Sequence, residues 1–233
     1  MSSDRPLGES EWAYESIVRS IPGINTSRTV AVAVQFIGFE AAILVLAAWY
    51  DLPGAAIAGT VAVIISVVGS LFMLVLSRAV RWEKAPSAYR EQLFGSRIEV
   101  FLGLLAFFIL VVYVFVYDPR QPGEALLTSV LGAYPPVVFV FLFLIIGWDV
   151  AYRIGVGWWT SVIGLWRSSR YGGELSPTLR AKFLRLDVAT IGYAALQLLF
   201  VPILAGHPLL QFVVIGHTVA VALVSGASIV LLR

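Results

Sequence analysis

Six stretches of this chain are apolar over lengths close to those needed to cross a lipid bilayer. A hydrocarbon core of about 30 Å requires roughly 20 helical residues. Because lipid offers no hydrogen-bond partners to the backbone, such stretches must be helices. Hydrophobic residues make up 59% of the 233. The sequence therefore predicts an all-α, polytopic membrane bundle of six transmembrane helices, at 29–50, 54–76, 98–117, 134–154, 188–205 and 209–232.

The positive charges fall on one side of this series. Of the 16 Lys and Arg residues, Arg120 alone lies in the connections after the first, third and fifth stretches. Basic residues in short loops stay in the cytoplasm during insertion. The count predicts cytoplasmic N- and C-termini, three helix hairpins and a multi-pass protein of the cell membrane.

The chain divides into a polar segment at 1–28, expected to be cytoplasmic or interfacial, and a single transmembrane domain at 29–233. Arg-rich cytoplasmic loops are predicted at 77–97 and 155–186. The tryptophan-rich run 155–166 suits the membrane interface, either as an extension of the fourth span or as a separate helix; a seventh span is the alternative. The link 118–133 fits a lid, a surface helix or a re-entrant segment, or a continuous helix from Leu126 kinked at Pro135-Pro136.

The two basic loops also resemble each other in sequence. Arg78, Arg81, Pro86, Arg90 and Arg97 recur as Arg167, Arg170, Pro177, Arg180 and Arg185, with offsets between 88 and 91. Residues 27–30 resemble a degenerate third copy. Internal repeats are common in transport folds, but loops on the positive side share composition in any case, so the repeat stays a hypothesis.

Two ionisable residues lie deep in the predicted spans. Glu40 lies eleven residues into the first span, where a charge costs about 2.5 to 3.5 kcal/mol. It is either an ion or proton site, or a neutral carboxyl hydrogen-bonded between helices. His217 lies near the middle of the last span. A Glu40–His217 pair is a candidate proton relay; the alternative for His217 is an interhelical hydrogen bond.

Gln197 and Asp149 complete the candidates for an ion or proton pathway. Asp149 precedes Arg153 by four residues, so the two can pair on one helical turn and fix the depth of the helix; a gate is the alternative. Glu99 and Asp187 each lie at the predicted start of a span, where an acid favours the positive helix N-terminus. The candidates for contact with anionic lipid headgroups or a partner are Arg78, Arg81, Arg90, Arg167, Arg170 and Arg180.

The sequence lacks the motifs of several classes of enzyme and pump. The chain has no cysteine and no HExxH, GxSxG or phosphate-binding GxxxxGK[ST] motif, and no lysine lies in a span. No catalytic residue, metal site, cofactor or nucleic-acid contact is predicted. The preferred hypothesis is a small ion- or proton-linked channel or secondary transporter, compatible with a homo-oligomer. The alternatives are a non-catalytic membrane subunit or scaffold, and an intramembrane enzyme of an unrecognised type.

Overall fold

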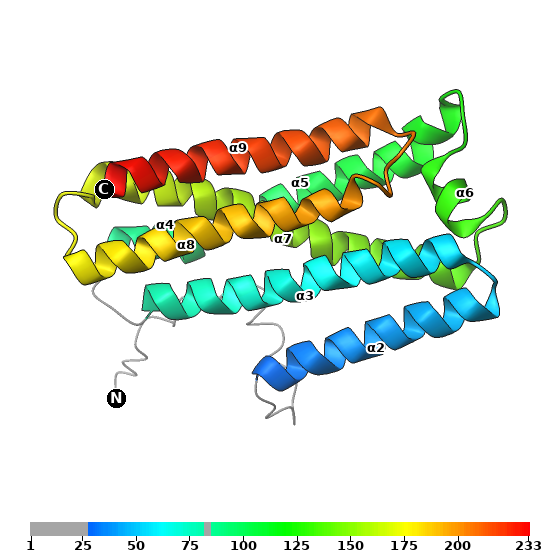
Figure 1. Cartoon of the computed structure of the whole chain (residues 1–233), viewed down its shortest axis with the longest axis horizontal. Helices are drawn as coiled ribbons and strands as arrows, with labels where there is room; N and C mark the ends of the chain where they lie inside the picture. Colours follow the sequence, from blue (N-terminus) through cyan, green and yellow to red (C-terminus); the bar gives the residue numbers. More distant parts are fainter. Residues whose placement is uncertain (1–27, 82–84) are drawn as a thin grey trace, which may run out of the picture.

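The computed structural model describes residues 28–81 and 85–233, and every regular element within these ranges is a helix. Six long helices lie side by side along one axis (Figure 1). They are α2 (Arg28–Trp49), α3 (Pro53–Arg81), α5 (Ile98–Val112), α7 (Val137–Tyr171), α8 (Pro177–Leu196) and α9 (Pro208–Leu232). The short elements are α4 (Ser87–Gly95), the π-helix η1 (Tyr113–Tyr117), the 3₁₀-helices η2 (Asp118–Arg120) and η3 (Gln197–Phe200), and α6 (Leu126–Leu131).

Five of these helical stretches are long and apolar enough to cross a bilayer: those of α3, of α5 with its flanking elements, of α7, of α8 with η3, and of α9. Their outward faces carry large exposed apolar side chains, such as Phe101, Phe212 and Leu223, which are 64%, 74% and 69% exposed. Such surfaces suit lipid better than water. The all-helical prediction is confirmed. The count of six spans and the cytoplasmic position of the termini stay predictions, and the segment 1–27 lies outside the described residues.

The bundle has two distinct ends (Figure 1). The basic end holds the end of α3, α4, the turn between α7 and α8, and the C-terminus. The α6 end holds α6, the turn between α2 and α3, and the turn between α8 and α9. Arg78, Arg170 and Arg233 lie at the basic end, whereas Arg120 lies at the α6 end.

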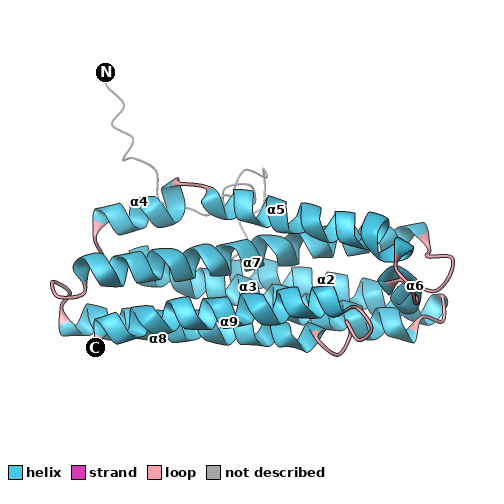
Figure 2. Cartoon of the chain, turned by 90° about the horizontal axis from the view of Figure 1, so that it is seen from above, coloured by secondary structure: helices cyan, strands magenta, loops and turns pink. Residues whose placement is uncertain are grey.

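Helix α7 is the centre of the bundle. It packs against α3, α4, α5, α8 and α9, and α4 and α5 cover one outer side of it (Figure 2). Its 35 residues reach about 50 Å, well beyond a hydrocarbon core. A Cβ atom on Gly155, near the midpoint of α7, would lie 2.6 Å from the backbone nitrogen of Gly103 on α5. Glycine is therefore required where these two backbones touch.

Most residues of the predicted cytoplasmic loop at 155–186 are helical, and their cytoplasmic position stays a prediction. Helix α7 runs on to Tyr171, and α8 begins at Pro177, eleven residues before the predicted start of the fifth span. The interpretation of 155–166 as an extension of the fourth span is confirmed. Ser176 caps α8 by accepting a hydrogen bond from the backbone N–H of Leu179. Membrane thickness sets where a helix must be apolar; it does not set where the helix ends.

The other connections also contain helices. The predicted loop 77–97 includes the last turn of α3 and all of α4. Arg97, with φ of 54°, interrupts the helical backbone between α4 and α5. In the link 118–133, α6 is a short separate helix that ends at Gly132 with φ of 77°. The alternative of one continuous kinked helix is wrong there. The two similar loops thus differ in structure: the first is interrupted at Arg97, whereas Arg185 lies inside a continuous α8.

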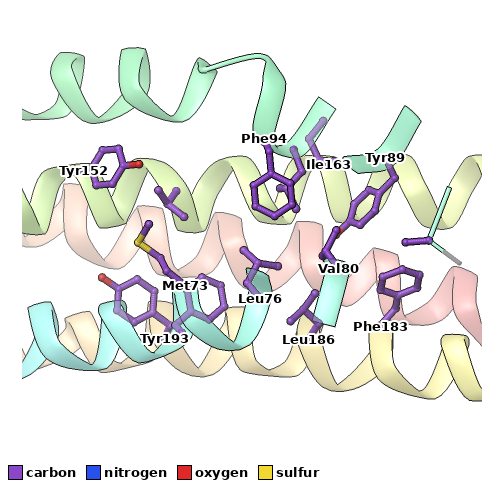
Figure 3. Close-up of a cluster of buried hydrophobic side chains, with 14 of the residues drawn as sticks. Met73, Leu76, Val80, Tyr89, Phe94, Tyr152, Ile163, Phe183, Leu186 and Tyr193 are labelled. Atoms are coloured by element: carbon purple, nitrogen blue, oxygen red, sulfur yellow. The ribbon is translucent and has the colours of Figure 1, made fainter. Parts of the chain in front are cut away.

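The main apolar core lies towards the basic end, between α3, α4, α7 and α8. Figure 3 shows part of it, with Tyr89 of α4 facing Phe183 of α8 and Met73 beside Tyr193. The rings of Tyr89 and Phe183 meet edge to face, with centroids 5.5 Å apart. Helix α4 is held in the bundle by its side chains Tyr89, Leu93 and Phe94, all buried.

Candidate functional site

An acid and a base four residues apart on α7 form the first of two interior ion pairs. We call Asp149 and Arg153 the local pair. Arg153 donates from Nη2 to Oδ1 of Asp149 at 2.7 Å and from Nε to Oδ2 at 2.9 Å. The arginine side chain is 2% exposed and the aspartate side chain 13%. Ser66 of α3 donates to Oδ2 of the same carboxylate. The predicted pairing is confirmed, and a second helix, α3, joins it through Ser66.

A glycine on α3 makes room for the local pair. A Cβ atom at Gly69 would lie 2.5 Å from Cδ of Arg153 and 2.7 Å from the hydroxyl oxygen of Tyr193 on α8. Both side chains therefore occupy space that any larger residue would fill. The Tyr193 hydroxyl is buried and has no hydrogen-bond partner among the described residues.

The second ion pair joins two helices near the basic end. We call Arg167 of α7 and Asp187 of α8 the cross-helix pair. Nη2 of Arg167 lies 2.7 Å from Oδ2 of Asp187, and the two side chains are 0% and 4% exposed. The hydroxyl of Ser228 on α9 donates to the same Oδ2 at 2.7 Å and lies 2.7 Å from the hydroxyl of Ser168. Three helices therefore meet at one carboxylate.

Aromatic rings complete the surroundings of Arg167. The guanidinium carbon lies 4.1 Å from the centroid of the Phe183 ring and 5.4 Å from that of Tyr89, so the ring faces stabilise the buried cation. On the other side, a Cβ atom at Gly164 would lie 3.1 Å from Oδ1 of Asp187. The absence of a side chain at Gly164 lets α8 bring its acid close to α7.

These findings correct two sequence-based predictions. Arg167 does not reach a surface where it could contact lipid headgroups, because it is fully buried. Asp187 does not lie at a helix N-terminus, because α8 begins ten residues earlier. Glu99 does lie in the first turn of α5, as predicted, and it is 1% exposed.

Three of the four residues in the two ion pairs lie on one face of α7. Asp149, Arg153, Thr160, Gly164 and Arg167 recur every three to seven residues, a spacing that keeps them on one side of a helix. We call them the polar face of α7. Several buried polar atoms on or beside it have no hydrogen-bond partner among the described residues: Oγ1 of Thr160, the hydroxyl of Tyr193, Oγ of Ser225, and Nε and Nη1 of Arg167. Such atoms are costly in a dry interior and are normally satisfied by water or a solute.

The proposed relay residues Glu40 and His217 are not brought together. Glu40 accepts a hydrogen bond from Oγ1 of Thr60 on α3 at 2.7 Å. His217 lies on α9, across the bundle from α2 (Figure 1), with its ring centroid 6.3 Å from that of Trp158. Oε2 of Glu40 and Nε2 of His217 are buried without a partner among the described residues. The bond to Thr60 matches the alternative prediction of an interhelical carboxyl.

Gln197 and the surface arginines complete the predicted set. Gln197 begins η3 with its side chain 2% exposed, and its Nε2 has no partner in the described part of the chain. It lies one turn beyond Tyr193 on the same side of the helix.

The arginines predicted to contact lipid or a partner differ in exposure. Arg78 and Arg170 are exposed at the basic end, and Arg90 is partly buried. Arg180 donates to the carbonyl of Gly172 at 2.9 Å and fastens the turn between α7 and α8. Arg81 ends α3, and its side chain lies outside the described residues.

The cross-helix pair and the roles of Ser66, Tyr193 and Ser228 were missed from the sequence. Ser66, Ser228 and Gly69 are small residues of the kind that suit helix interfaces, so their types alone indicate packing and not a bond to a charge. A usable signal existed, since a charge in or near an apolar helix needs a partner. That rule identifies Arg167 and Asp187 as charges to be matched, but their separation of 20 residues gives no geometric reason to match them with each other. Within 28–81 and 85–233, no three His, Asp or Glu side chains gather as metal ligands.

With the fold and the interior network described, the chain can be compared with known proteins. A family model matches residues 7–228, nearly the whole chain. The chain belongs to DUF7530, a family of unknown function. No curated protein and no solved structure matches it. The DUF7530 match spans all the helices of the bundle except the last residues of α9, so the polar face of α7 lies within the family's domain.

Proposed function

We propose that this protein is a small membrane transporter or channel that moves protons or another cation along the polar face of α7. The observation that carries the proposal is a row of buried polar atoms that have no partner among the described residues and lie between and beside the two buried ion pairs. A helix that only had to pack would lose nothing if Thr160 and Tyr193 were apolar, because their hydroxyls make no bond within the described structure.

Energetics support this interpretation. Replacing a buried ion pair by apolar side chains of similar volume is often neutral or stabilising, so stability alone gives little reason to bury two such pairs. Ionisable residues inside membrane helices commonly mark ion or proton paths. Unpartnered hydroxyls and amides between them are suitable positions for water molecules that relay a proton.

Each part of the network has a role in this proposal. Asp149 accepts the proton; once neutral, it holds Arg153 less strongly, and the guanidinium can turn away from it. Tyr193 and Gln197 extend the path towards the α6 end. Thr160 extends it towards the cross-helix pair, which forms its inner boundary near the basic end. The path is neutral at rest, because each buried charge is paired with its opposite.

The full chain in proteoliposomes loaded with a pH-sensitive dye tests the proposal. With an inward-negative potassium potential, we expect proton uptake well above that of protein-free vesicles. Asp149→Asn should reduce the rate at least about tenfold, since it removes the carboxylate that is proposed to accept the proton. Glu174→Gln is the matched control, because Glu174 is exposed in the turn between α7 and α8.

A second variant separates transport from folding. Thr160→Val keeps the shape of a buried side chain and removes a hydroxyl that has no partner among the described residues. We expect unchanged stability in detergent and a clearly lower proton flux, whereas Thr128→Val in α6 should change neither. Fluxes of wild type, Asp149→Asn and Thr160→Val that all equal the leak of empty vesicles, for protons and for sodium or potassium, would refute the proposal.

A further inference from the structure

A hollow opens at the α6 end of the bundle, far from the cross-helix pair. It lies between η1 and η2, the segment leading to α6, and the turn between α8 and α9, and its volume is about 450 Å³. Small-molecule sites commonly occupy about 300 to 1,000 Å³. Two turns shape it, at Gly123 with φ of 112° and at Gly206 with φ of 92°, both in the left-handed region that favours glycine.

The hollow has a rigid polar anchor. Asp118 and His207 both line it, with side chains 4% and 6% exposed. Nδ1 of His207 lies 2.8 Å from Oδ1 of Asp118, and the backbone N–H of Leu126 donates to Oδ2 at 2.6 Å. The carboxylate therefore joins the α8–α9 turn to the first residue of α6. This anchor fixes the imidazole in one orientation.

The free edge of the imidazole is the second observation. A carboxylate only accepts hydrogen bonds, so in the neutral ring Nδ1 carries the proton and Nε2 is an acceptor. Within the described residues, Nε2 of His207 has no protein partner, although the side chain is more than nine-tenths buried. An acceptor on a largely buried ring at the wall of a hollow is suited to a ligand that donates a hydrogen bond.

The charge of the lining selects the class of ligand. Asp118 and Glu124 are acids, and no lysine or arginine of the described residues lines the hollow. The nearby Arg120 donates to the carbonyl of Val116 at 2.7 Å. Tyr113 and Tyr117 also line the hollow, with ring centroids 5.4 Å apart, and offer aromatic faces of the kind that attract organic cations.

We propose that this hollow binds a small organic cation of the protonated amine class. The ammonium group donates to Nε2 of His207 and is attracted by the carboxylates of Asp118 and Glu124, while its alkyl part lies against the tyrosine rings. The site stands apart from the polar face of α7. It does not depend on the transport proposal.

The two histidines of the chain make the site directly observable. We would label the imidazole nitrogens of the full chain with ¹⁵N in detergent and titrate n-butylammonium chloride, with n-butanol and sodium butyrate as matched neutral and anionic probes. His217→Gln assigns the signals. We expect butylammonium to shift Nε2 of His207 saturably and to leave His217 unchanged, while the alcohol and the anion produce no saturable shift.

Two variants test which side chains contribute to the affinity for butylammonium. Glu124→Gln removes an exposed carboxyl at the rim and should raise the dissociation constant of butylammonium about three- to fivefold, the range for a partly exposed charge pair. Glu174→Gln at the opposite end should leave it unchanged. His207→Asn places an amide N–H near the position of Nδ1 but removes Nε2, and should weaken binding further.

Three results would overturn the proposal: no shift of the His207 signal by butylammonium, an equal or stronger response to butyrate, or identical affinity in wild type and Glu124→Gln. Glu124→Gln keeps the test decisive if His207→Asn fails to fold, because its side chain is exposed and forms no hydrogen bond within the described structure. Loss of proton flux leaves these outcomes unaffected, so the two proposals fail separately.

Discussion

The local pair and the cross-helix pair contain the same two residue types and are held in different ways. Asp149 and Arg153 are four residues apart on α7, so forming that helix already brings them together. Arg167 and Asp187 are 20 residues apart on two helices and meet only when α7 and α8 pack. Both pairs carry the cost of burying charge. Only the cross-helix pair needs helix packing to bring its two charges together.

This difference indicates separate roles for the two sites. The two residues of the local pair stay close together through changes in helix packing, because they lie on one helix. The cross-helix pair adds Ser228 and joins three helices at one carboxylate. It is therefore expected to hold the basic end together.

The largest effect is expected from Arg167→Met. This substitution leaves the carboxylate of Asp187 buried without its cation, and we expect a loss of about 3 to 5 kcal/mol in the free energy of unfolding. Unfolding in mixed detergent micelles, followed by tryptophan fluorescence, measures it. The double variant Arg167→Met with Asp187→Leu should recover much of the loss, because no unpaired charge then remains at this site. A single variant as stable as wild type would contradict the proposed role of the cross-helix pair.

A smaller effect is expected from Arg153→Met at the local pair. Asp149 is more exposed than Asp187, 13% against 4%, and keeps its bond from Ser66. We expect a loss of about 2 kcal/mol, roughly half that of Arg167→Met. The same micelle assay compares the two. If Arg153→Met proved the more damaging, the distinction between a local and a tertiary role would have to be reversed.

The smallest effects are expected at the two serines. Ser228→Ala removes a donor from a fully buried carboxylate and should cost about 1 to 2 kcal/mol, whereas Ser66→Ala should cost about 0.5 kcal/mol. A double-mutant cycle with Arg167→Met should show coupling to Ser228 and none to Ser66, because only Ser228 contacts the cross-helix pair. Equal coupling would show that the two sites act as one network.

Sequence reasoning predicted what depends on composition and local spacing. The helical class and the segregation of basic residues follow from patterns along the whole chain. The bond between Asp149 and Arg153 follows from their spacing on one helix. An extension of the fourth span was one of the predictions for 155–166, but the end of α7 at Tyr171 did not follow, because residues 167–170 are polar enough for a loop and yet are helical in the packed bundle. The acceptor for Arg167 did not follow either, because Asp187 is 20 positions away in the sequence. The contact between Asp118 and His207 did not follow, because these residues are 89 positions apart.

The contact between Gly103 and Gly155 has a mechanical consequence for α7. A helix whose backbone contacts a neighbour near its midpoint can rock about that contact more easily than it can slide along its axis. Sliding would push side chains of α7 against the backbone of α5, where there is no free space. Rocking moves the two tips of α7 in opposite directions. A displacement at the α6 end would therefore reach the basic end reversed in sign, without any break in the helix between them.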